Sequence, residues 1–117
     1  MKVILADDHP IFRSGLKFLV ESSFDHVEIQ AYENGSQVID NIPLFNPDIV
    51  LLDIDMPVMD GLTSARQIRA LPCARGKVPI VALTADVMND AVQQTMAAGM
   101  NAFLSKPLQK NQLITKS

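Results

Sequence analysis

The sequence predicts a three-layer α/β fold built on an open, five-stranded parallel sheet. The first observation is a set of three short, continuous apolar runs, over residues 3–6, 49–52 and 80–83. Such runs are typical of strands that are buried on both faces, as parallel strands are. The second observation is that segments with the spacing of amphipathic helices separate these runs. Strands that alternate with helices predict a doubly wound parallel sheet with helices on both of its faces.

Two further strands complete the predicted sheet. Val27, Ile29 and Ala31 alternate with polar residues, which predicts a strand buried on one side, at the edge of the sheet. A short fifth strand is expected over residues 102–105. If the three continuous runs are central, the strand order 2-1-3-4-5 fits, although other orders stay open at this point. That order is flavodoxin-like, and it places the switch point, where ligands bind, between the first and third strands.

Each predicted helix shows a start signal, an apolar stripe or an end signal. Pro10 suits the first turn of the first helix, Asn34 with Gln37 resembles a capping pair for the second, and Asp60 suits the cap of the third. Gly99 predicts the end of the fourth helix. The apolar stripes are, in order, Phe12, Leu16, Leu19 and Val20; Val38, Ile39 and Ile42; Leu62, Ala65 and Ile68; Met88, Val92 and Met96; and, in a short fifth helix, Leu113 and Ile114.

Length and composition indicate one domain in a reducing compartment. A chain of 117 residues fits a single domain, since domains typically hold roughly 100–150 residues. The net charge of −3 argues against binding to nucleic acid. The longest apolar stretch, residues 78–85, is far shorter than the ~20 residues that cross a bilayer. Cys73 is the single cysteine and cannot form an internal disulfide. We therefore expect a cytoplasmic domain.

Acidic residues follow two strands at the edge of the sheet where ligands are expected. Asp7 and Asp8 follow the first strand, Asp53 follows the third, and Asp55 lies two residues further on. Each alone has a structural explanation, because acids often cap helices or are the first solvated residues after a buried strand. Together they repel one another unless a cation intervenes. Hard oxygen ligands of this kind suit Mg²⁺.

The other chemistry-bearing residues favour phosphoryl transfer over zinc binding. His9 and His26 lack partners at metal spacing, so a zinc site is not expected. Thr84 ends the fourth strand and Lys106 ends the fifth. A Thr at a strand end usually serves only as a β-branched residue that suits a strand, and a lone Lys is usually solvated. A divalent cation, an ammonium and a hydroxyl that converge on a carboxylate, however, form a phosphoryl-transfer site with an aspartyl phosphate.

Four motifs resemble the receiver (phosphoacceptor) domain of two-component response regulators. They are residues 5–8, 51–61, 80–85 and 103–107. All four stand in order and at receiver spacing, and the resemblance runs from residue 3 to about residue 113. It implies a single receiver domain over residues 1–117, with no output domain in the chain. Such a domain is not a classical enzyme; it accepts a phosphoryl group from the phosphohistidine of a histidine kinase or a histidine phosphotransfer domain.

The resemblance implies roles for the acidic residues. Asp53 is similar to the phosphorylated aspartate. Asp8 and Asp53 are similar to carboxylate ligands of Mg²⁺, with Mn²⁺ as a possible substitute. Asp7 would act largely through a coordinated water, and the backbone carbonyl of Asp55 would be a further ligand.

The resemblance also implies a switch. Thr84 resembles the switch hydroxyl, and Lys106 resembles the lysine that pairs with the phosphate and whose bond to Pro107 is normally cis in this family. Phe103 stands at the position of the switch aromatic; it lacks the hydroxyl of the commoner Tyr, so its switch would work through packing. The face formed by the fourth helix, the fifth strand and the fifth helix would then change on phosphorylation.

Two alternatives and one question of context stay open. Asp53 and Asp55 also look like the nucleophile and acid of haloacid-dehalogenase-like phosphatases, although there the later acid pair follows the nucleophile. A receiver-like binding module that is never phosphorylated is the other alternative. Residues 8–16 look like receivers joined to helix-turn-helix output domains, whereas residues 85–107 look more like receivers of hybrid sensor histidine kinases. We favour the hybrid-kinase context.

Overall fold

The computed structural model describes residues 1–54, 56, 59–72, 76–84 and 89–105. Its centre is a five-stranded sheet in the order β2-β1-β3-β4-β5, in which each neighbouring pair is parallel. The strands are β1 (Lys2–Ala6), β2 (Glu28–Tyr32), β3 (Ile49–Asp53), β4 (Ile80–Thr84) and β5 (Ala102–Ser105). The predicted fold class and strand order are confirmed, and β2 lies at an edge as expected.

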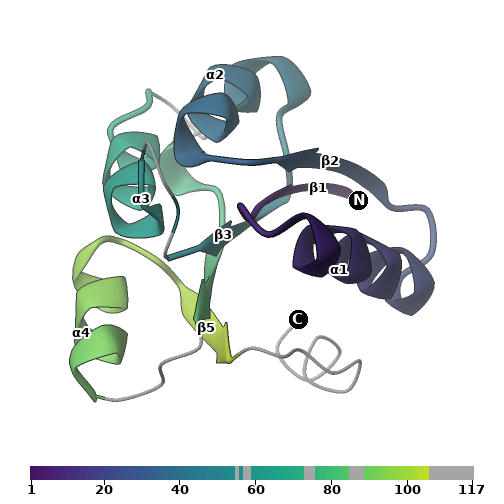
Figure 1. The fold of residues 1–117 in the computed structure, drawn as a ribbon. Coiled ribbons are helices and arrows are strands. Elements are labelled where there is room, and N and C mark those ends of the chain that lie inside the picture. The colour runs from purple at the N-terminus through teal and green to yellow at the C-terminus, as the bar shows by residue number, and fades with distance from the viewer. Residues whose placement is uncertain (55, 57–58, 73–75, 85–88, 106–117) are drawn as a thin grey trace.

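Helices connect the strands and cover both faces of the sheet (Figure 1). They are α1 (Pro10–Ser23), α2 (Gly35–Phe45), α3 (Gly61–Arg69) and α4 (Asn89–Ala97). α1 lies on one face, whereas α2 and α3 lie side by side on the other. Pro10 occupies the first turn of α1, as predicted. The predicted fifth helix, with Leu113 and Ile114, lies outside the described residues, as does Met88.

The predicted caps of α2 and α3 are confirmed. The side chain of Asn34 accepts a hydrogen bond from the backbone N–H of Gln37 at 3.0 Å. The carboxylate of Asp60 accepts one from the backbone N–H of Thr63 at 2.7 Å. Gly99 follows α4 with a φ of 92°, a left-handed conformation that a residue with a Cβ rarely adopts. The local signals for the ends of these helices therefore work as the sequence indicates.

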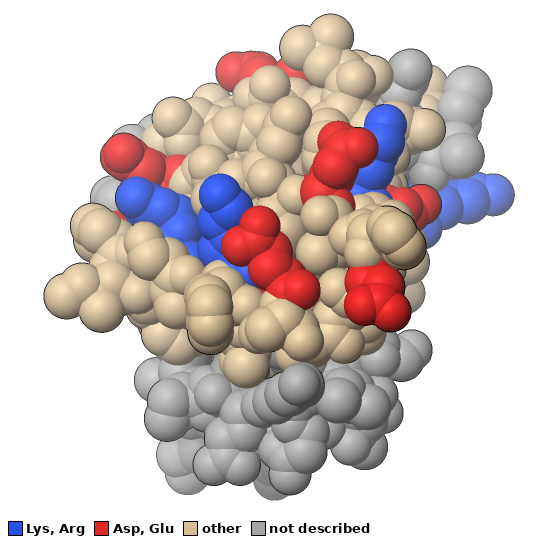
Figure 2. Space-filling view, turned by 90° about the vertical axis from the view of Figure 1, so that its right-hand side faces the viewer, with Lys and Arg blue, Asp and Glu red and all other residues tan. Residues whose placement is uncertain are grey.

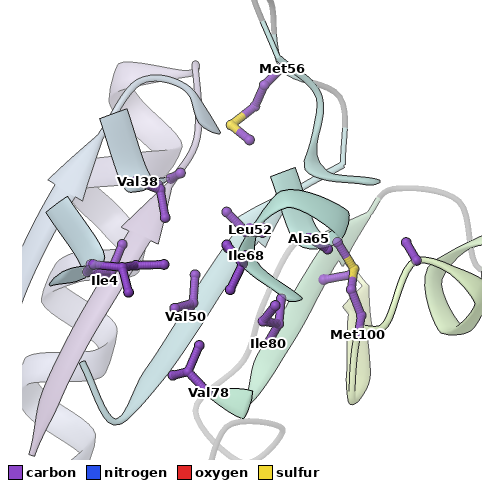
Figure 3. Close-up of a cluster of buried hydrophobic side chains, with 14 of the residues drawn as sticks. Ile4, Val38, Val50, Leu52, Met56, Ala65, Ile68, Val78, Ile80 and Met100 are labelled. Atoms are coloured by element: carbon purple, nitrogen blue, oxygen red, sulfur yellow. The ribbon is translucent and has the colours of Figure 1, made fainter. Parts of the chain in front are cut away.

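Two apolar clusters, one on each face of the sheet, form the core. Ile4 contributes to the cluster under α2 and α3, together with Val38 and Ile68 (Figure 3). Leu5 contributes to the cluster under α1, together with Leu16. Consecutive residues of β1 thus enter opposite clusters, because side chains alternate along a strand. This two-sided burial explains why the central strands are continuously apolar.

The predicted burial of the edge strand is wrong in part. Val27 and Ile29 are half-buried and pack against the cluster under α1, as expected. Ala31 is exposed, and the neighbouring Tyr32 is half-buried against the opposite cluster. An edge strand has a neighbour on one side only, so its short side chains are poorly covered, whereas the long ring of Tyr32 reaches the core.

The predicted apolar stripe of α4 is also wrong at Met96. Met96 is 54% exposed, whereas Thr95 and Ala98 are buried. Adjacent helical residues lie about 100° apart around the axis, so the buried face differs from the predicted one by about one position. Thr95 and Ala98 have smaller side chains than Met96, so the spacing of large apolar residues does not identify them as the buried positions.

The surface provides two further observations. No helix within the described ranges is both long enough and apolar enough to span a bilayer. On the side of the molecule that lies at the right in Figure 1, Lys and Arg side chains are interspersed with Asp and Glu (Figure 2). This face therefore lacks, over the part that the structure describes, the continuous basic stripe typical of nucleic-acid-binding proteins.

Candidate functional site

Parallel pairing of β1 and β3 brings distant acidic residues together at the carboxyl edge of the sheet. Ala6 pairs with Leu52, so Asp7 and Asp53 follow at the same level on neighbouring strands. The backbone N–H of Asp7 donates to the carbonyl of Tyr32 at 3.1 Å, which continues the pairing beyond β1. The N–H of Ile54 donates to the carbonyl of Leu83 at 3.0 Å, which does the same beyond β3. The backbone on both sides of the acids is therefore held by the sheet.

The acidic side chains form a close group that is mostly removed from solvent. Asp7 is 0% exposed and Asp53 is 2% exposed, whereas the side chain of Asp8 keeps 29% of its surface accessible. One possible ligand atom from each of these residues, together with one from His9, lies within 4.8 Å of the others. Carboxylates this close repel one another, and a bound cation would offset that repulsion.

His9 also belongs to this group, which contradicts the prediction that it lacks partners at metal spacing. Its Nδ1 lies 3.1 Å from Asp7 Oδ1, 3.1 Å from Asp8 Oδ1 and 4.0 Å from Asp53 Oδ2. The prediction was wrong because it considered only partners at the regular spacing of metal-binding motifs. The available signal was simpler, namely that His9 directly follows two acids at a strand end.

The segment that carries Asp7 and His9 is fixed by α1. The guanidinium of Arg13 donates from Nη1 to the carbonyl of Asp7 at 2.7 Å. The backbone N–H of Arg13 donates to the carbonyl of His9 at 2.8 Å, which starts the helix. The N–H of His9 in turn donates to Asp7 Oδ1 at 2.8 Å. Sequence reasoning missed Arg13, which acts as a positioning residue because it links the first helical turn to the end of β1.

A glycine allows α3 to begin directly against the end of β3. The N–H of Gly61 donates to the carbonyl of Ile54 at 2.9 Å. A Cβ on Gly61 would lie 2.5 Å from the backbone oxygen of Asp53 and 2.9 Å from the Cα of Ile54. These are backbone atoms, which cannot move aside easily. Gly61 is thus a second residue that sequence reasoning did not single out, although it supports the backbone that bears Asp53.

Thr84 and Phe103 lie further along the same sheet. Thr84 ends β4 and is 5% exposed. Its neighbour Leu83 pairs with Asp53, so Thr84 stands one residue beyond the level of that acid. Ala82 pairs with Phe103, and since side chains alternate along strands, Thr84 shares a sheet face with Phe103. Phe103 is half-buried against the cluster under α2 and α3.

Three of the predicted site residues lie outside the part of the chain that the structure describes. These are Asp55, Lys106 and Pro107. The predicted carbonyl ligand, the phosphate-pairing lysine and the cis peptide bond therefore stay predictions.

The described residues fit a hard divalent cation. Asp8 Oδ1 is buried and accepts no hydrogen bond, even though His9 Nδ1 lies 3.1 Å away. A buried carboxylate oxygen without a hydrogen-bond donor is costly unless a charge of opposite sign compensates it. Carboxylates from three positions also supply the oxygen ligands that Mg²⁺ and Mn²⁺ prefer. Asp7, Asp8 and Asp53 are thus the residues that could hold such an ion.

The chain is similar to known proteins over most of its length. The chain is 33% identical to the signal transduction histidine-protein kinase BarA of Shigella flexneri over 113 residues, which are 97% of this chain but 12% of BarA. It is 32% identical to the transcriptional regulatory protein YdfI of Bacillus subtilis over 90% of this chain and 47% of YdfI. The chain therefore spans only part of these relatives.

A solved structure is similar over nearly the whole chain. It is the receiver domain of the sensor histidine kinase PA1611 from Pseudomonas aeruginosa, with a magnesium ion coordinated in its active site cleft. The TM-score is 0.87 at 28% identity, and the similarity covers 98% of this chain and 92% of that one. The family model described as "Response regulator receiver domain" matches residues 3–117. This chain belongs to the response regulator receiver domain family, and so is a receiver domain of two-component signalling.

Proposed function

We propose that Asp53 accepts a phosphoryl group from the phosphohistidine of a histidine kinase or a histidine phosphotransfer domain. One observation carries this proposal, namely that Asp53 lies at the carboxyl end of the central strand β3, within 4.8 Å of the ligand atoms of Asp7 and Asp8. A carboxylate in that position is both a nucleophile and part of a cation site. The chain belongs to the receiver domain family, and the resemblance of Asp53 to the phosphorylated aspartate of that family supports the proposal.

The transfer is a displacement at phosphorus. A carboxylate oxygen of Asp53 attacks the phosphorus atom of the phosphohistidine, and the bond between phosphorus and the imidazole nitrogen breaks. The imidazole leaves with the electron pair of that bond. Since the nucleophile is an ionised carboxylate, no proton has to be removed from it before the attack. The chain acts on itself in this step, which is why we do not propose a classical enzyme.

The surrounding residues position the nucleophile and compensate the charge. When bound, Mg²⁺ offsets negative charge on the transferring phosphoryl group. Asp7 and Asp8 would hold this ion together with Asp53, and the backbone carbonyl of Asp55 is proposed as a further ligand. Lys106 is proposed to pair with the phosphoryl oxygens. The hydrogen bonds around Asp7 and Ile54 keep the two strand ends in place during the reaction.

The proposed output is a change in packing on the sheet face shared by Thr84 and Phe103. The phosphoryl group would attract the hydroxyl of Thr84, which donates a hydrogen bond to it. Movement of Thr84 alters the space beside Phe103, whose ring can then repack against its half-buried surroundings. Packed cores favour discrete arrangements over continuous deformation, so phosphorylation shifts the population between two states. The affected surface would be the face that contains α4, β5 and the expected fifth helix.

Phosphorylation by a small phosphodonor tests the proposal. Acetyl phosphate with Mg²⁺ should add one phosphoryl group, measured by intact-protein mass spectrometry, and chelation of the metal should prevent it. Asp53→Asn should abolish the labelling. Asp40→Asn is a matched control, because Asp40 is exposed on α2, away from the strand ends. Equal labelling of the wild type and Asp53→Asn would overturn the assignment of Asp53.

We further propose that the parent protein is a hybrid sensor histidine kinase whose receiver domain lies in the cytoplasm. Similarity to the histidine-protein kinase BarA supports this context, although similarity to the transcriptional regulatory protein YdfI also fits a receiver in a transcriptional regulator. The coding sequence that flanks this segment tests the proposal. A kinase transmitter core upstream agrees with it, whereas a helix-turn-helix domain downstream contradicts it.

A further inference from the structure

His9 carries an imidazole into the acidic group although its side chain has no role in capping α1. It is the N-cap residue of α1, with an extended backbone conformation, and its side chain makes no capping hydrogen bond. The backbone of His9 is held on both sides, since its N–H donates to Asp7 Oδ1 and its carbonyl accepts from Arg13. The side chain is 64% exposed. Burial in the core therefore does not explain where this ring lies.

The distances from the ring nitrogen have the dimensions of one coordination sphere. Small divalent cations bind oxygen at about 2.1 Å in octahedral geometry, so neighbouring ligand atoms lie about 3.0 Å apart and opposite ones about 4.2 Å apart. His9 Nδ1 lies 3.1 Å from Asp7 Oδ1, a contact that is also a hydrogen bond when Nδ1 carries the proton. It lies 3.1 Å from Asp8 Oδ1 as well, and both distances are close to the first value. It lies 4.0 Å from Asp53 Oδ2, close to the second.

We propose that His9 is a ligand, through Nδ1, of the divalent cation held by the acidic group. This inference rests on the cation site of the proposed function and adds a nitrogen ligand to it. His9 would take a coordination position that water otherwise fills.

A nitrogen ligand changes which metals the site prefers. Carboxylate and water ligands suit Mg²⁺, whereas imidazole suits later transition metals such as Co²⁺ and Zn²⁺, and affinity for a mixed site rises along the first transition series from Mn²⁺. The site should therefore favour Mn²⁺ and Co²⁺ over Mg²⁺ more strongly than a site built from carboxylates alone. The competing explanation is that the imidazole only pairs electrostatically with the carboxylates, and in that case a bound cation would displace it.

His9→Phe separates these explanations, because phenylalanine keeps a planar ring and lacks the nitrogen. No capping hydrogen bond is lost in this variant. The matched control is His26→Asn, which changes the other histidine of the chain at an exposed position. His26 has a φ of 55°, a left-handed conformation that asparagine tolerates. Circular dichroism on thermal unfolding checks that both variants fold, and His9→Ser provides a second variant if His9→Phe does not.

Mn²⁺ is the probe, and pulsed electron paramagnetic resonance is the readout. Mn²⁺ bound to the wild type should show nitrogen modulation from a coordinated imidazole. This signal should disappear in His9→Phe and persist in His26→Asn. In a titration, His9→Phe should bind Mn²⁺ about tenfold more weakly or worse, with a smaller change for Mg²⁺.

The possible failures can be told apart. Binding of Mn²⁺ to the wild type without nitrogen modulation would overturn the role of His9 and leave the acidic site intact. A folded wild type that binds no Mn²⁺ would overturn both the role of His9 and the cation site. Loss of labelling at Asp53 is measured separately by mass spectrometry, so it reports on the proposed function and not on His9.

Discussion

Gly61 lies in direct contact with the backbone of Asp53, closely enough that a Cβ at Gly61 would lie 2.5 Å from the Asp53 carbonyl oxygen. This contact joins the start of α3 to the end of β3. It means that the acid at the centre of the site is positioned partly by a residue without any side chain.

Gly61→Ala should destabilise the protein and impair phosphorylation. The new methyl group would push the β3–α3 connection away from Asp53, and overpacking of this kind costs about 1–3 kcal/mol. Urea unfolding followed by circular dichroism measures the loss. Gly15→Ala is the matched control, because a Cβ at Gly15 in α1 would meet no atom within 4 Å. That control should gain about 0.5–1 kcal/mol from helix propensity. Equal effects of the two variants would contradict the role of Gly61.

Arg69→Ala should destabilise the fold without changing the acidic residues. The Arg69 guanidinium donates hydrogen bonds to the carbonyls of Gly99, Gly76 and Val78, and to the side chain of Asn101, at 2.7–3.0 Å. Burial lowers the pKa of Arg69 below its ordinary value because desolvation disfavours the charged form, and these four acceptors offset that cost. Arg69 therefore ties the end of α3 to the segments that precede β4 and β5.

The expected loss for Arg69→Ala is about 1–3 kcal/mol, since four oxygen acceptors lose a charged donor that is only partly shielded from water. Arg66→Ala changes an exposed arginine one turn earlier in α3 and should alter stability by about 0.5 kcal/mol or less. Thermal and urea unfolding of the two variants give the comparison. A loss at Arg66 as large as that at Arg69 would show that helix charge, and not this set of hydrogen bonds, is responsible.

Mg²⁺ should stabilise the wild type, and Asp53→Asn should abolish most of this effect. A cation that binds only the folded state adds about 2.7 kcal/mol at a concentration of a hundred times its Kd. Removal of one carboxylate weakens that binding, and it also relieves repulsion among the acids, so metal-free Asp53→Asn should be more stable than metal-free wild type. Melting temperatures with Mg²⁺ and with a chelator measure both effects. Asp40→Asn should respond to Mg²⁺ like the wild type.

Thr84→Val should separate phosphorylation from its structural consequence. The variant keeps a β-branched side chain at the end of β4 but lacks the hydroxyl that we propose to contact the phosphoryl group. Acetyl phosphate should still label Asp53, whereas the resonances of Phe103 and of the neighbouring α4 residues should change less on phosphorylation than in the wild type. NMR spectra of labelled and unlabelled protein measure this. Thr84→Ser should restore the change, and full switching in Thr84→Val would contradict the role of the hydroxyl.

Much of the fold follows from local patterns in the chain. The continuous apolar runs predicted β1, β3 and β4, and Asn34 and Asp60 predicted the starts of α2 and α3. These signals work because a strand buried on both faces must be apolar throughout, and because a cap is made between residues two or three positions apart. The acids at the strand ends were also predicted to meet, since parallel strands bring their carboxyl ends to one edge.

The contacts between distant segments could not be predicted in this way. His9 was expected to lack partners, yet the start of α1 and the pairing of β1 with β3 place its Nδ1 3.1 Å from Asp8 Oδ1 and 4.0 Å from Asp53 Oδ2. Met96 was expected in the core, yet the packing of α4 buries Thr95 instead. The spacing of apolar residues indicates which kind of element forms. The rotation of a helix on a sheet and the approach of two backbones depend instead on the shapes of the surfaces that meet. In this receiver domain the sequence is therefore sufficient to identify the strands, the helix caps and the acidic residues of the site. Packing in three dimensions decides that the imidazole of His9 lies beside these acids and that Gly61 contacts the end of β3.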